Sequence, residues 1–326
     1  MNEFSLVLLA ASVVATAAPI LLASLGETLT ERAGLINLSL DGTILLAAMA
    51  AFAVAHDTGS VGLGFAAAAA VGGAVAALVG FAGVILGVSQ VAVGFVLTLM
   101  CRDLAYFLGN PYSRIQGPQV PPLPVPGLAE LPVLGPLLFR HNAVVYLSLL
   151  LVPALWWVLY RTKWGLEVRA VGEHPEAAYA RGIAPRQVQM VCAVVGGALV
   201  GLAGAAYSLA LKPGWGRPQG AEGIGWIALA LVIFGGWHPV KVALGAVLFA
   251  LLQVAGIPLQ EAFPSVPAQV FQVAPFPLMI FTLLFMGLSQ RESVERWAEG
   301  RPWAKRLVGA FRGAAPRALG RPMKGG

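Results

Sequence analysis

The sequence has 326 residues, of which 58% are hydrophobic and 11% are charged, and its formal net charge is +6. Soluble domains carry about 25% charged residues, so this composition excludes a soluble globular protein, a disordered protein and a disulfide scaffold. From Gln290 onward the chain holds nine basic and three acidic residues, which leaves twelve of each in residues 1–289. The excess charge therefore lies in the tail, and nothing in it indicates a nucleic-acid partner.

Uncharged apolar runs divide the chain into candidate membrane spans. A helix needs roughly 20 mostly apolar residues to cross about 30 Å of hydrocarbon. Runs that approach or exceed this length cover residues 4–26, 58–101, 141–160, 187–211, 223–240, 242–260 and 262–290. The second run is long enough for two crossings, with a break near Gly87–Gln90. Residues 33–55 form a further crossing that is interrupted at Asn37 and Asp41. The predicted fold is an all-α, polytopic transmembrane bundle of about nine spans, within a range of about eight to ten.

Lysine and arginine predict the orientation, because they stay on the cytoplasmic side of short loops. Sixteen of the 21 basic residues lie in the loop 161–186, in the tail, or at Arg32 and Lys241. The proposed outer loops hold only four: Arg114, Arg140, Lys212 and Arg217. This asymmetry predicts a transmembrane domain over 1–289 and a basic cytoplasmic tail over 290–326. With nine spans, the N-terminus lies outside.

The predicted outer loop 110–140 is unusually rich in proline. It contains eight prolines, at positions 111, 118, 121, 122, 124, 126, 132 and 136. Proline at this density prevents a regular helix and favours extended or short-turned backbone. The loop is interpreted either as a cap over the outer mouth or as a plain linker.

Small residues recur every four positions in two of the predicted spans. One row is Gly72, Ala76 and Gly80, and the other is Gly197, Gly201 and Ala205. Lipid supplies no hydrophobic drive between helices, so small faces that let backbones approach closely hold a bundle together. The rows predict tight helix packing, either within the chain or against a partner.

Polar residues interrupt the apolar stretch between 33 and 55. Asn37, Ser39 and Asp41 lie there with glycine on both sides. Intramembrane carboxylates are costly and face a polar interior or a partner. Non-helical backbone at this depth survives only when it is buried in protein or lines a cavity. Two interpretations remain open: a helix break beside a transport pathway, or a satisfied structural knot.

The stretch 172–183 predicts a short helix in the cytoplasmic loop. Pro175 suits the first helical position, Glu176 favours the positive helix N-terminus, and Gly182 can end the helix in a left-handed conformation. Such a helix is shaped to dock into another protein. A solvated loop helix without a partner is the alternative.

Three segments together resemble the membrane permeases of ABC importers, in the branch that serves branched-chain amino acids, simple sugars and nucleosides. Residues 31–42 look like the family's ERAGxxNLGxEG segment, with Ser39 for glycine and Asp41 for glutamate. Residues 161–178 are similar to its RTxxGLxxRAVGENPxAA loop, with His174 where asparagine is usual and would cap the helix better. Residues 223–239 resemble the GxGFIALALVIFGxWxP segment of the simple-sugar and nucleoside sub-branch.

The resemblance implies an ABC importer permease fold in a bacterial cytoplasmic (inner) membrane. It implies a second homologous permease subunit, an ABC ATPase subunit, an extracytoplasmic solute-binding lipoprotein and contact with membrane lipid. Helix 175–181 would receive the motion of the ATPase, and the implied contact residues are Glu173, His174, Pro175, Glu176, Ala177, Arg181 and Gly182. The chain has no Gly-x-x-x-x-Gly-Lys-Ser/Thr phosphate loop. We therefore expect a transport subunit that is not itself an enzyme, with no cofactor, metal or nucleic acid.

The function that this resemblance implies is ATP-driven import of a nucleoside or simple sugar by alternating access. The candidate pathway residues are Asn37, Asp41, Thr98, Trp226 and Gln253, and an ordinary interhelical hydrogen bond is the alternative for each. Import of branched-chain amino acids is an alternative function. An ion-coupled secondary transporter is another, although it would need several intramembrane carboxylates. A membrane enzyme is a third, but the sequence has no His-Glu-x-x-His motif.

Overall fold

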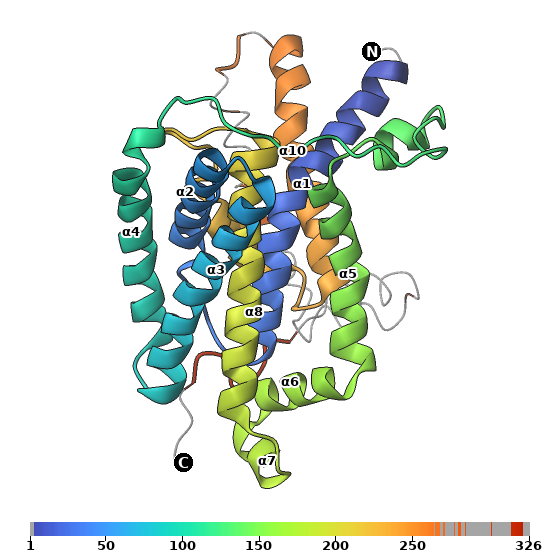
Figure 1. The fold of residues 1–326 in the computed structure, drawn as a ribbon. Helices are drawn as coiled ribbons and strands as arrows, with labels where there is room; N and C mark the ends of the chain where they lie inside the picture. Colours follow the sequence, from blue (N-terminus) through green and yellow to red (C-terminus); the bar gives the residue numbers. More distant parts are fainter. Residues whose placement is uncertain are drawn as a thin grey trace.

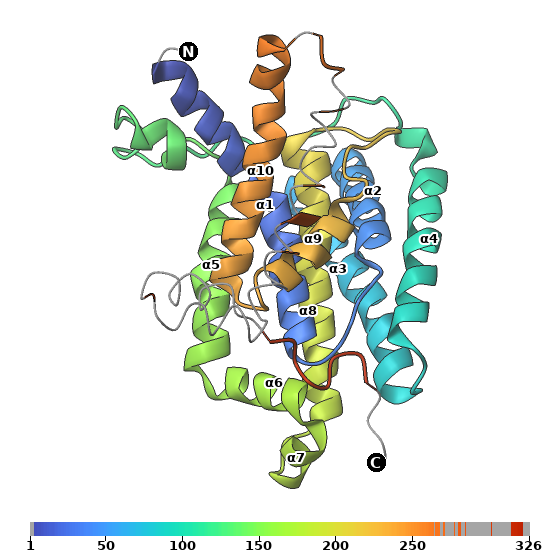
Figure 2. The ribbon, with the colours of Figure 1, turned by 180° about the vertical axis from the view of Figure 1, so that it is seen from behind.

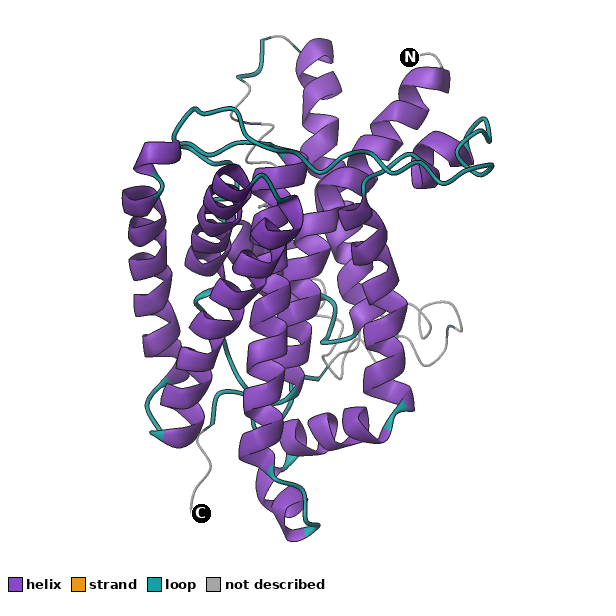
Figure 3. Cartoon of the chain, in the orientation of Figure 1, coloured by secondary structure: helices purple, strands orange, loops and turns teal. Residues whose placement is uncertain are grey.

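The computed structural model describes residues 3–263 and 314–321, together with 265–267, 270, 277, 280, 281, 284 and 301. The described residues form a bundle of helices joined by loops (Figures 1 and 3), with one isolated β-bridge between Pro122 and Asn142. The prediction of an all-α fold is confirmed. The boundary predicted between a domain over 1–289 and a tail over 290–326 falls outside the described residues and stays a prediction.

The α-helices follow the apolar runs and end at residues that suit helix ends. They are α1 (Glu3–Arg32), α2 (Leu40–Thr58), α3 (Val61–Gly80), α4 (Gln90–Leu108), α5 (Ala143–Arg161), α6 (Lys163–Glu173), α7 (Pro175–Ala180), α8 (Pro185–Ala206), α9 (Ile224–Phe234) and α10 (Pro239–Ala262). A π-helical turn extends α3 over Phe81–Ile85, and another extends α8 over Tyr207–Leu211. Seven of the described helices are long and apolar enough to cross a membrane.

The break predicted inside the run 58–101 is confirmed. The first crossing ends at Ile85 and α4 begins at Gln90. Gly87 has a φ of 69°, a conformation that glycine adopts at little cost. The Ser89 hydroxyl then accepts the Ala92 N–H at 3.3 Å and so caps α4.

The prediction that 223–240 forms a full crossing is wrong. In the structure α9 has 11 residues, which rise about 16 Å and reach about half of the hydrocarbon thickness. Gly235 ends α9, the chain turns through residues 235–238, and Pro239 is the first residue of α10. The predicted crossing 262–290 lies almost wholly outside the described residues.

The helices pack around α1 and α8, which run side by side along the middle of the bundle (Figure 1). From behind, Figure 2 shows the short α9 between α10 and α2. The N-terminus lies at the same end of the bundle as the proline-rich loop, and α7 lies at the opposite end with residues 314–321. The structure thus groups the loops by end as the basic residues predict.

The two predicted rows of small residues form one seam between α3 and α8. A β-carbon at Gly72 would collide with the Gly197 carbonyl oxygen, and one at Gly201 would collide with the Ala68 carbonyl oxygen. Ala76 lies against Gly197 from the α3 side. The rows therefore pack within the chain, because only residues without larger side chains let these backbones approach this closely.

The proline-rich loop is partly a cap. Its first part crosses the end of the bundle, where the Arg114 N–H bonds to the Trp215 carbonyl at 2.9 Å and the Val120 N–H to the Leu209 carbonyl at 2.8 Å. The part after Pro122 projects beyond α5 and α1 and then returns to α5 (Figure 1). The loop thus covers the end of the bundle with its first part, and its later turn Gly135–Phe139 packs against α1.

Candidate transport and coupling sites

The chain between α1 and α2, residues 33–39, is buried or partly buried without being helical. Side chains from two helices, α4 and α8, bond to its backbone. The side-chain oxygen of Gln90 accepts the Ile36 N–H at 2.9 Å, the Thr98 hydroxyl donates to the Leu38 carbonyl at 2.6 Å, and the side-chain amide of Gln189 donates to the Ala33 carbonyl at 3.1 Å. Protein groups therefore replace the water that non-helical backbone would otherwise need.

Asn37 organises the start of α2. Its side-chain oxygen accepts the Ser39 N–H at 3.1 Å and the Ser39 hydroxyl at 2.6 Å. The Ser39 hydroxyl also lies 3.1 Å from the Thr43 hydroxyl. Asn37 and Ser39 are both buried. This part of the break matches the interpretation as a satisfied structural knot.

Asp41 joins α2 to α9. One oxygen of its carboxylate accepts the Gly225 N–H at 3.2 Å, across 184 positions of sequence. A β-carbon at Gly225 would collide with the Asp41 backbone, so only glycine permits this approach. The N-termini of α2 and α9 therefore meet inside the bundle, where their free N–H groups and dipoles favour electron-rich atoms. The non-helical loop before α2 thus lies beside the N-terminus of α9.

The structure brings together four of the five candidate pathway residues. Thr98 bonds to the loop beside Asn37, and Trp226 follows Gly225 directly in α9. The Trp226 side chain is 39% exposed, so it lies on a face that the described chain leaves open. Gln253 is partly buried on α10, and no hydrogen bond in the described part of the chain joins it to the other four.

Two carboxylates that were not predicted as site residues lie in the last turns of α1. Glu27 is fully buried and accepts the Asn37 N–H at 3.2 Å, while Glu31 accepts the indole N–H of Trp237. The uncharged apolar run ends at residue 26, directly before Glu27. The i, i+4 spacing of two carboxylates before a polar break is the signal that could have identified them.

The predicted coupling segment has the expected local structure. Pro175 is the first residue of α7, which ends at Ala180, and Gly182 has a φ of 83°. The His174 side chain makes no capping hydrogen bond to α7, as expected from its replacement of asparagine. Tyr179 is 73% exposed at the end of the bundle.

A shallow hollow of about 300 Å³ lies between α6 and α7. Its lining is mostly apolar and consists of Ala170, Glu173, His174, Ala177, Ala178, Arg181 and Ile183. Four of the seven predicted contact residues line this hollow: Glu173, His174, Ala177 and Arg181. The geometry offers a partner a concave surface with charged groups on its rim.

Residues 314–321 form a strap across the same end of the bundle. The Ala318 N–H bonds to the Gly172 carbonyl at 2.9 Å, and the Gly320 N–H bonds to the Gly34 carbonyl at 3.0 Å. Arg317 adds an exposed ion pair to Glu173 at 3.9 Å. The strap therefore connects the end of α6 with the loop that leads to Asn37 and Asp41.

At the opposite end, Glu222 holds the loop that leads into α9. Its carboxylate accepts the Tyr106 hydroxyl, the Gln219 N–H at 2.8 Å and the Gly220 N–H at 2.6 Å. Partial burial acts to raise the pKa of Glu222, but these hydrogen bonds outweigh it and lower the pKa. Arg217 lies 4.8 Å from the centre of the Tyr106 ring. The start of α9 is thereby fastened to α4.

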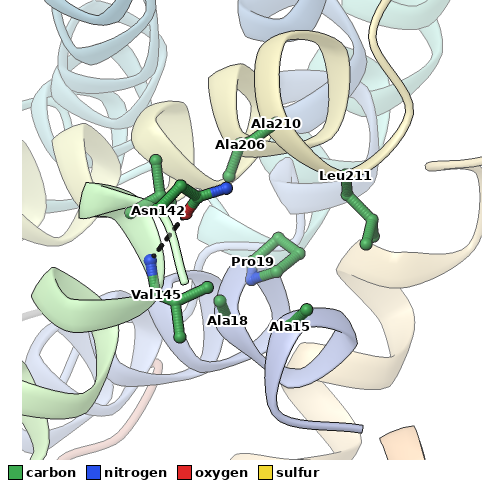
Figure 4. Close-up of a pocket in the computed structure, with 9 residues that line it drawn as sticks. Ala15, Ala18, Pro19, Asn142, Val145, Ala206, Ala210 and Leu211 are labelled. Carbon is green, nitrogen blue, oxygen red and sulfur yellow. Dashed lines mark hydrogen bonds between the residues drawn. The ribbon is translucent and has the colours of Figure 1, made fainter. Parts of the chain in front are cut away.

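A second hollow, where α1, α5 and the end of α8 meet, is too small for a solute (Figure 4). Its volume is about 30 Å³ and its lining includes Pro19 and Asn142. The Asn142 side chain turns aside to accept the Val145 N–H at 3.1 Å. A space of this size admits about one or two water molecules.

Among the described residues, no group of three or more histidine, cysteine or acidic side chains is arranged to hold a metal ion. Both cysteines, Cys101 and Cys192, are free and buried.

The sequence was compared with known families and proteins. Residues 9–283 match the family described as the permease component of the branched-chain amino acid transport system. The chain belongs to this permease family. The match covers most of the first candidate span, all of the other six and the short α9, so the predicted ABC importer permease fold is confirmed.

The permease is similar to three curated proteins along most of its length. It is 42% identical over 73% of this chain, and 74% of the other, to a putative glucose ABC transporter permease protein of Haloferax volcanii. It is 30% identical to the guanosine ABC transporter permease protein of Bacillus subtilis, over 89% and 94% of the two chains. It is 29% identical to a nucleoside ABC transporter permease protein of Lactococcus lactis, over 91% and 96%. No solved structure matches the chain.

Family membership decides between the predicted classes. The permease is a multi-pass membrane subunit of an ABC importer, and the ATPase of such a transporter is a separate subunit. The predictions of a transport subunit and of a protein that is not an enzyme are confirmed. The alternatives of an ion-coupled secondary transporter and a membrane enzyme do not agree with this membership.

Proposed function

We propose that the permease imports a nucleoside or a simple sugar by alternating access, driven by ATP in its partner subunit. The observation that carries this proposal is the similarity, over most of the chain, to permeases named for glucose, guanosine and nucleosides. Both solute classes are uncharged and rich in hydroxyl groups. A pathway for them needs hydrogen-bonding groups and few charges, which agrees with the composition of the spans.

We place the pathway beside the meeting point of α2 and α9. Broken helices whose N-termini point into a membrane protein are typical of transporter binding sites. The junction of these helices is held by hydrogen bonds from Asn37, Asp41 and Thr98. The partly exposed Trp226 ring supplies a flat surface for a base or sugar ring. Gln253 is a further candidate from α10.

We propose that a second, homologous permease covers the open face beside Trp226. This chain is also similar, over a shorter stretch, to a second guanosine permease protein of Bacillus subtilis, which supports a homologous partner. The ATPase subunit would dock on the hollow between α6 and α7, at Glu173, His174, Pro175, Glu176, Ala177, Arg181 and Gly182. An extracytoplasmic solute-binding lipoprotein would deliver the solute.

The permease is proposed to lie in a bacterial cytoplasmic membrane with its C-terminus in the cytoplasm. Sixteen of its 21 basic residues are on the side assigned to the cytoplasm, which is the asymmetry that cytoplasmic loops show. The basic tail would contact anionic lipid there, and each nearby lysine or arginine contributes about 1 kcal/mol to such binding.

Competition for uptake tests the solute. Cells that express the complete transporter are given radiolabelled guanosine or glucose, and cells that lack only this permease are the control. We expect permease-dependent uptake of one of the two, which an excess of unlabelled solute of the same class abolishes. If only unlabelled leucine reduced permease-dependent uptake, the result would contradict the proposal and favour import of branched-chain amino acids.

Two substitutions test the coupling segment. Glu176→Ala removes an acidic group from the α7 N-terminus, and Gly182→Ala places a β-carbon at a φ of 83°. We expect both to reduce uptake more than ATP hydrolysis, because the ATPase would then contact α7 in a changed position. Gly127→Ala is the matched control, since Gly127 has a φ of 78° and is equally unobstructed. Wild-type uptake in both α7 variants would contradict the assignment.

A further inference from the structure

The turn between α9 and α10 has an unusual backbone. Trp237 has a φ of 57°, in the left-handed region that residues with a β-carbon rarely adopt, and Gly236 before it has a φ of 58°. Such strain persists where the surrounding contacts impose it, and it concentrates at functional sites. Trp237 is buried, so its contacts identify what imposes this conformation.

Two consecutive residues at the end of α1 hold the turn. The Arg32 guanidinium donates from Nε to the Trp237 carbonyl at 2.7 Å and from Nη2 to the Gly236 carbonyl at 3.4 Å. Glu31 accepts the indole N–H of the same tryptophan. The backbone and the side chain of Trp237 are therefore both fixed to the last turn of α1.

The same guanidinium reaches α5. Arg32 Nη2 also donates to the Tyr160 hydroxyl at 3.0 Å. The Tyr160 ring lies 5.1 Å from the Arg169 guanidinium of α6, and its centre is 5.1 Å from that of the His238 ring. Tyr160 thus touches α6, α1 and the start of α10 at once.

The end of α6 also contacts Arg32 directly. A β-carbon at Gly172 would collide with the Arg32 carbonyl oxygen, so these backbones are in direct contact. A displacement of α6 would therefore act on Arg32 both through its main chain and through Tyr160. With only 11 residues, α9 is short enough to move as one rigid element. Movement of its C-terminal turn would therefore shift Gly225, in its first turn, relative to Asp41.

We propose that Arg32 and Tyr160 are positioning residues that link the coupling segment to α9, so that movement of α6 opens or closes the junction between α9 and α2. The proposal rests on the proposed coupling of this permease to an ATPase. It adds a mechanical route from the cytoplasmic surface to the helix junction, through a guanidinium that bonds α5 and the α9–α10 turn together.

Tyr160→Phe tests the link, because it removes the hydroxyl and keeps the ring beside Arg169 and His238. In the assembled transporter reconstituted into vesicles, we expect the solute imported per ATP hydrolysed to fall about fivefold or more. The KM for solute and the assembly of the complex should not change. Tyr146→Phe is the control, because it also removes a hydrogen-bonded tyrosine hydroxyl: this one accepts the His141 N–H and donates to the Leu123 carbonyl at the opposite end.

Arg32→Lys is the second variant, because one ammonium group cannot reproduce the guanidinium that joins Tyr160 to the turn. It decides the test if Tyr160→Phe does not assemble. An unchanged ratio of solute imported to ATP hydrolysed in the variant would overturn the proposal. An equal loss of uptake and hydrolysis leaves this ratio unchanged and would overturn it too, because a merely structural role predicts that result. If the wild-type complex does not import solute with ATP, the proposed function fails instead.

Discussion

At the scale of single residues, the loop 33–39 depends on polar side chains that would be costly in a helix facing lipid. Glu27, Gln90, Thr98 and Gln189 each bond to its backbone. Each such bond replaces one that water would supply in a soluble protein. The polarity of these spans is therefore concentrated where the backbone leaves the helix.

Asp41 provides one prediction at this scale. Asp41→Asn keeps an oxygen that can accept the Gly225 N–H, whereas Asp41→Ala leaves that buried N–H unpaired. We expect the alanine variant to lose about 1–3 kcal/mol of stability and the asparagine variant to stay near wild type. Thermal unfolding in detergent measures the difference. Equal losses in both variants would show that the carboxylate charge, rather than the hydrogen bond, is what matters.

His238 provides a prediction for pH. Burial lowers the pKa of His238 below its usual 6.5, and Lys241 and Arg32 lower it further. The unfolded chain then binds a proton at a higher pH than the folded chain, so stability falls as the pH drops below about 6.5. We expect the melting temperature to decrease between pH 7.5 and pH 5.5, and His238→Gln to reduce that decrease. A pH dependence that is the same in wild type and variant would exclude this histidine as the cause.

At the scale of elements, close backbone approach holds the helices together. The seam between α3 and α8 is formed by glycine and alanine on both sides, and the end of α1 joins α8 where a β-carbon at Gly26 would collide with the Gly196 carbonyl. In lipid, such packing replaces the hydrophobic drive that assembles a soluble core. A single larger side chain in a seam should therefore be poorly tolerated.

Gly201→Val tests the seam. The added side chain would force α8 away from the Ala68 carbonyl of α3, and overpacking of this kind costs about 1–3 kcal/mol. Gly62→Val is the control, because a β-carbon at Gly62, near the start of α3, would meet only the Ser60 hydroxyl, at an ordinary contact distance of 3.8 Å. Melting temperatures of the two variants in detergent are compared. A control variant as unstable as Gly201→Val would contradict the packing explanation.

The strap 314–321 gives a second prediction for elements. Gly320 has a φ of 70°, and a β-carbon there would lie 2.6 Å from the Ile36 side chain, so Gly320→Val should displace the strap. We expect faster hydrogen exchange at the Ala318 amide, which bonds to Gly172. Arg317→Ala should change this exchange little, since its ion pair is exposed and contributes about 0–1 kcal/mol. Unaltered exchange in Gly320→Val would contradict the contact.

At the scale of the whole molecule, the two ends of the bundle carry different elements. One end carries α7, the strap and the hollow between α6 and α7, and the other carries the proline-rich loop (Figures 1 and 2). The helix junction at Asp41 and Gly225 lies inside the bundle between them. The proposed coupling requires that the first end faces the cytoplasm.

Cysteine labelling tests this orientation. Both natural cysteines are buried, so reagents should reach only introduced ones. A membrane-impermeant maleimide should label Leu123→Cys in intact cells and should label Tyr179→Cys only after the membrane is opened, because both side chains are exposed but at opposite ends. The reverse pattern would invert the proposed topology.

The sequence by itself determined the features that depend on near neighbours. The break at Gly87–Gln90, the bounds of α7, the rows of small residues and the unequal charge of the two ends all follow from patterns within a few turns of helix. Such patterns are readable because capping, helix periodicity and membrane thickness act locally. The resemblance of three segments then indicated the family.

Only the tertiary structure decided which distant groups meet. The bond from Gly225 to Asp41 spans 184 positions and that from Arg32 to Trp237 spans 205. The apolar run after Gly223 looked like a full crossing because hydropathy does not register that Gly235, Gly236 and Pro239 turn the chain after 11 residues. Likewise the burial of Glu27 and Glu31 could not be predicted, since it depends on a backbone N–H and an indole N–H that folding brings to them.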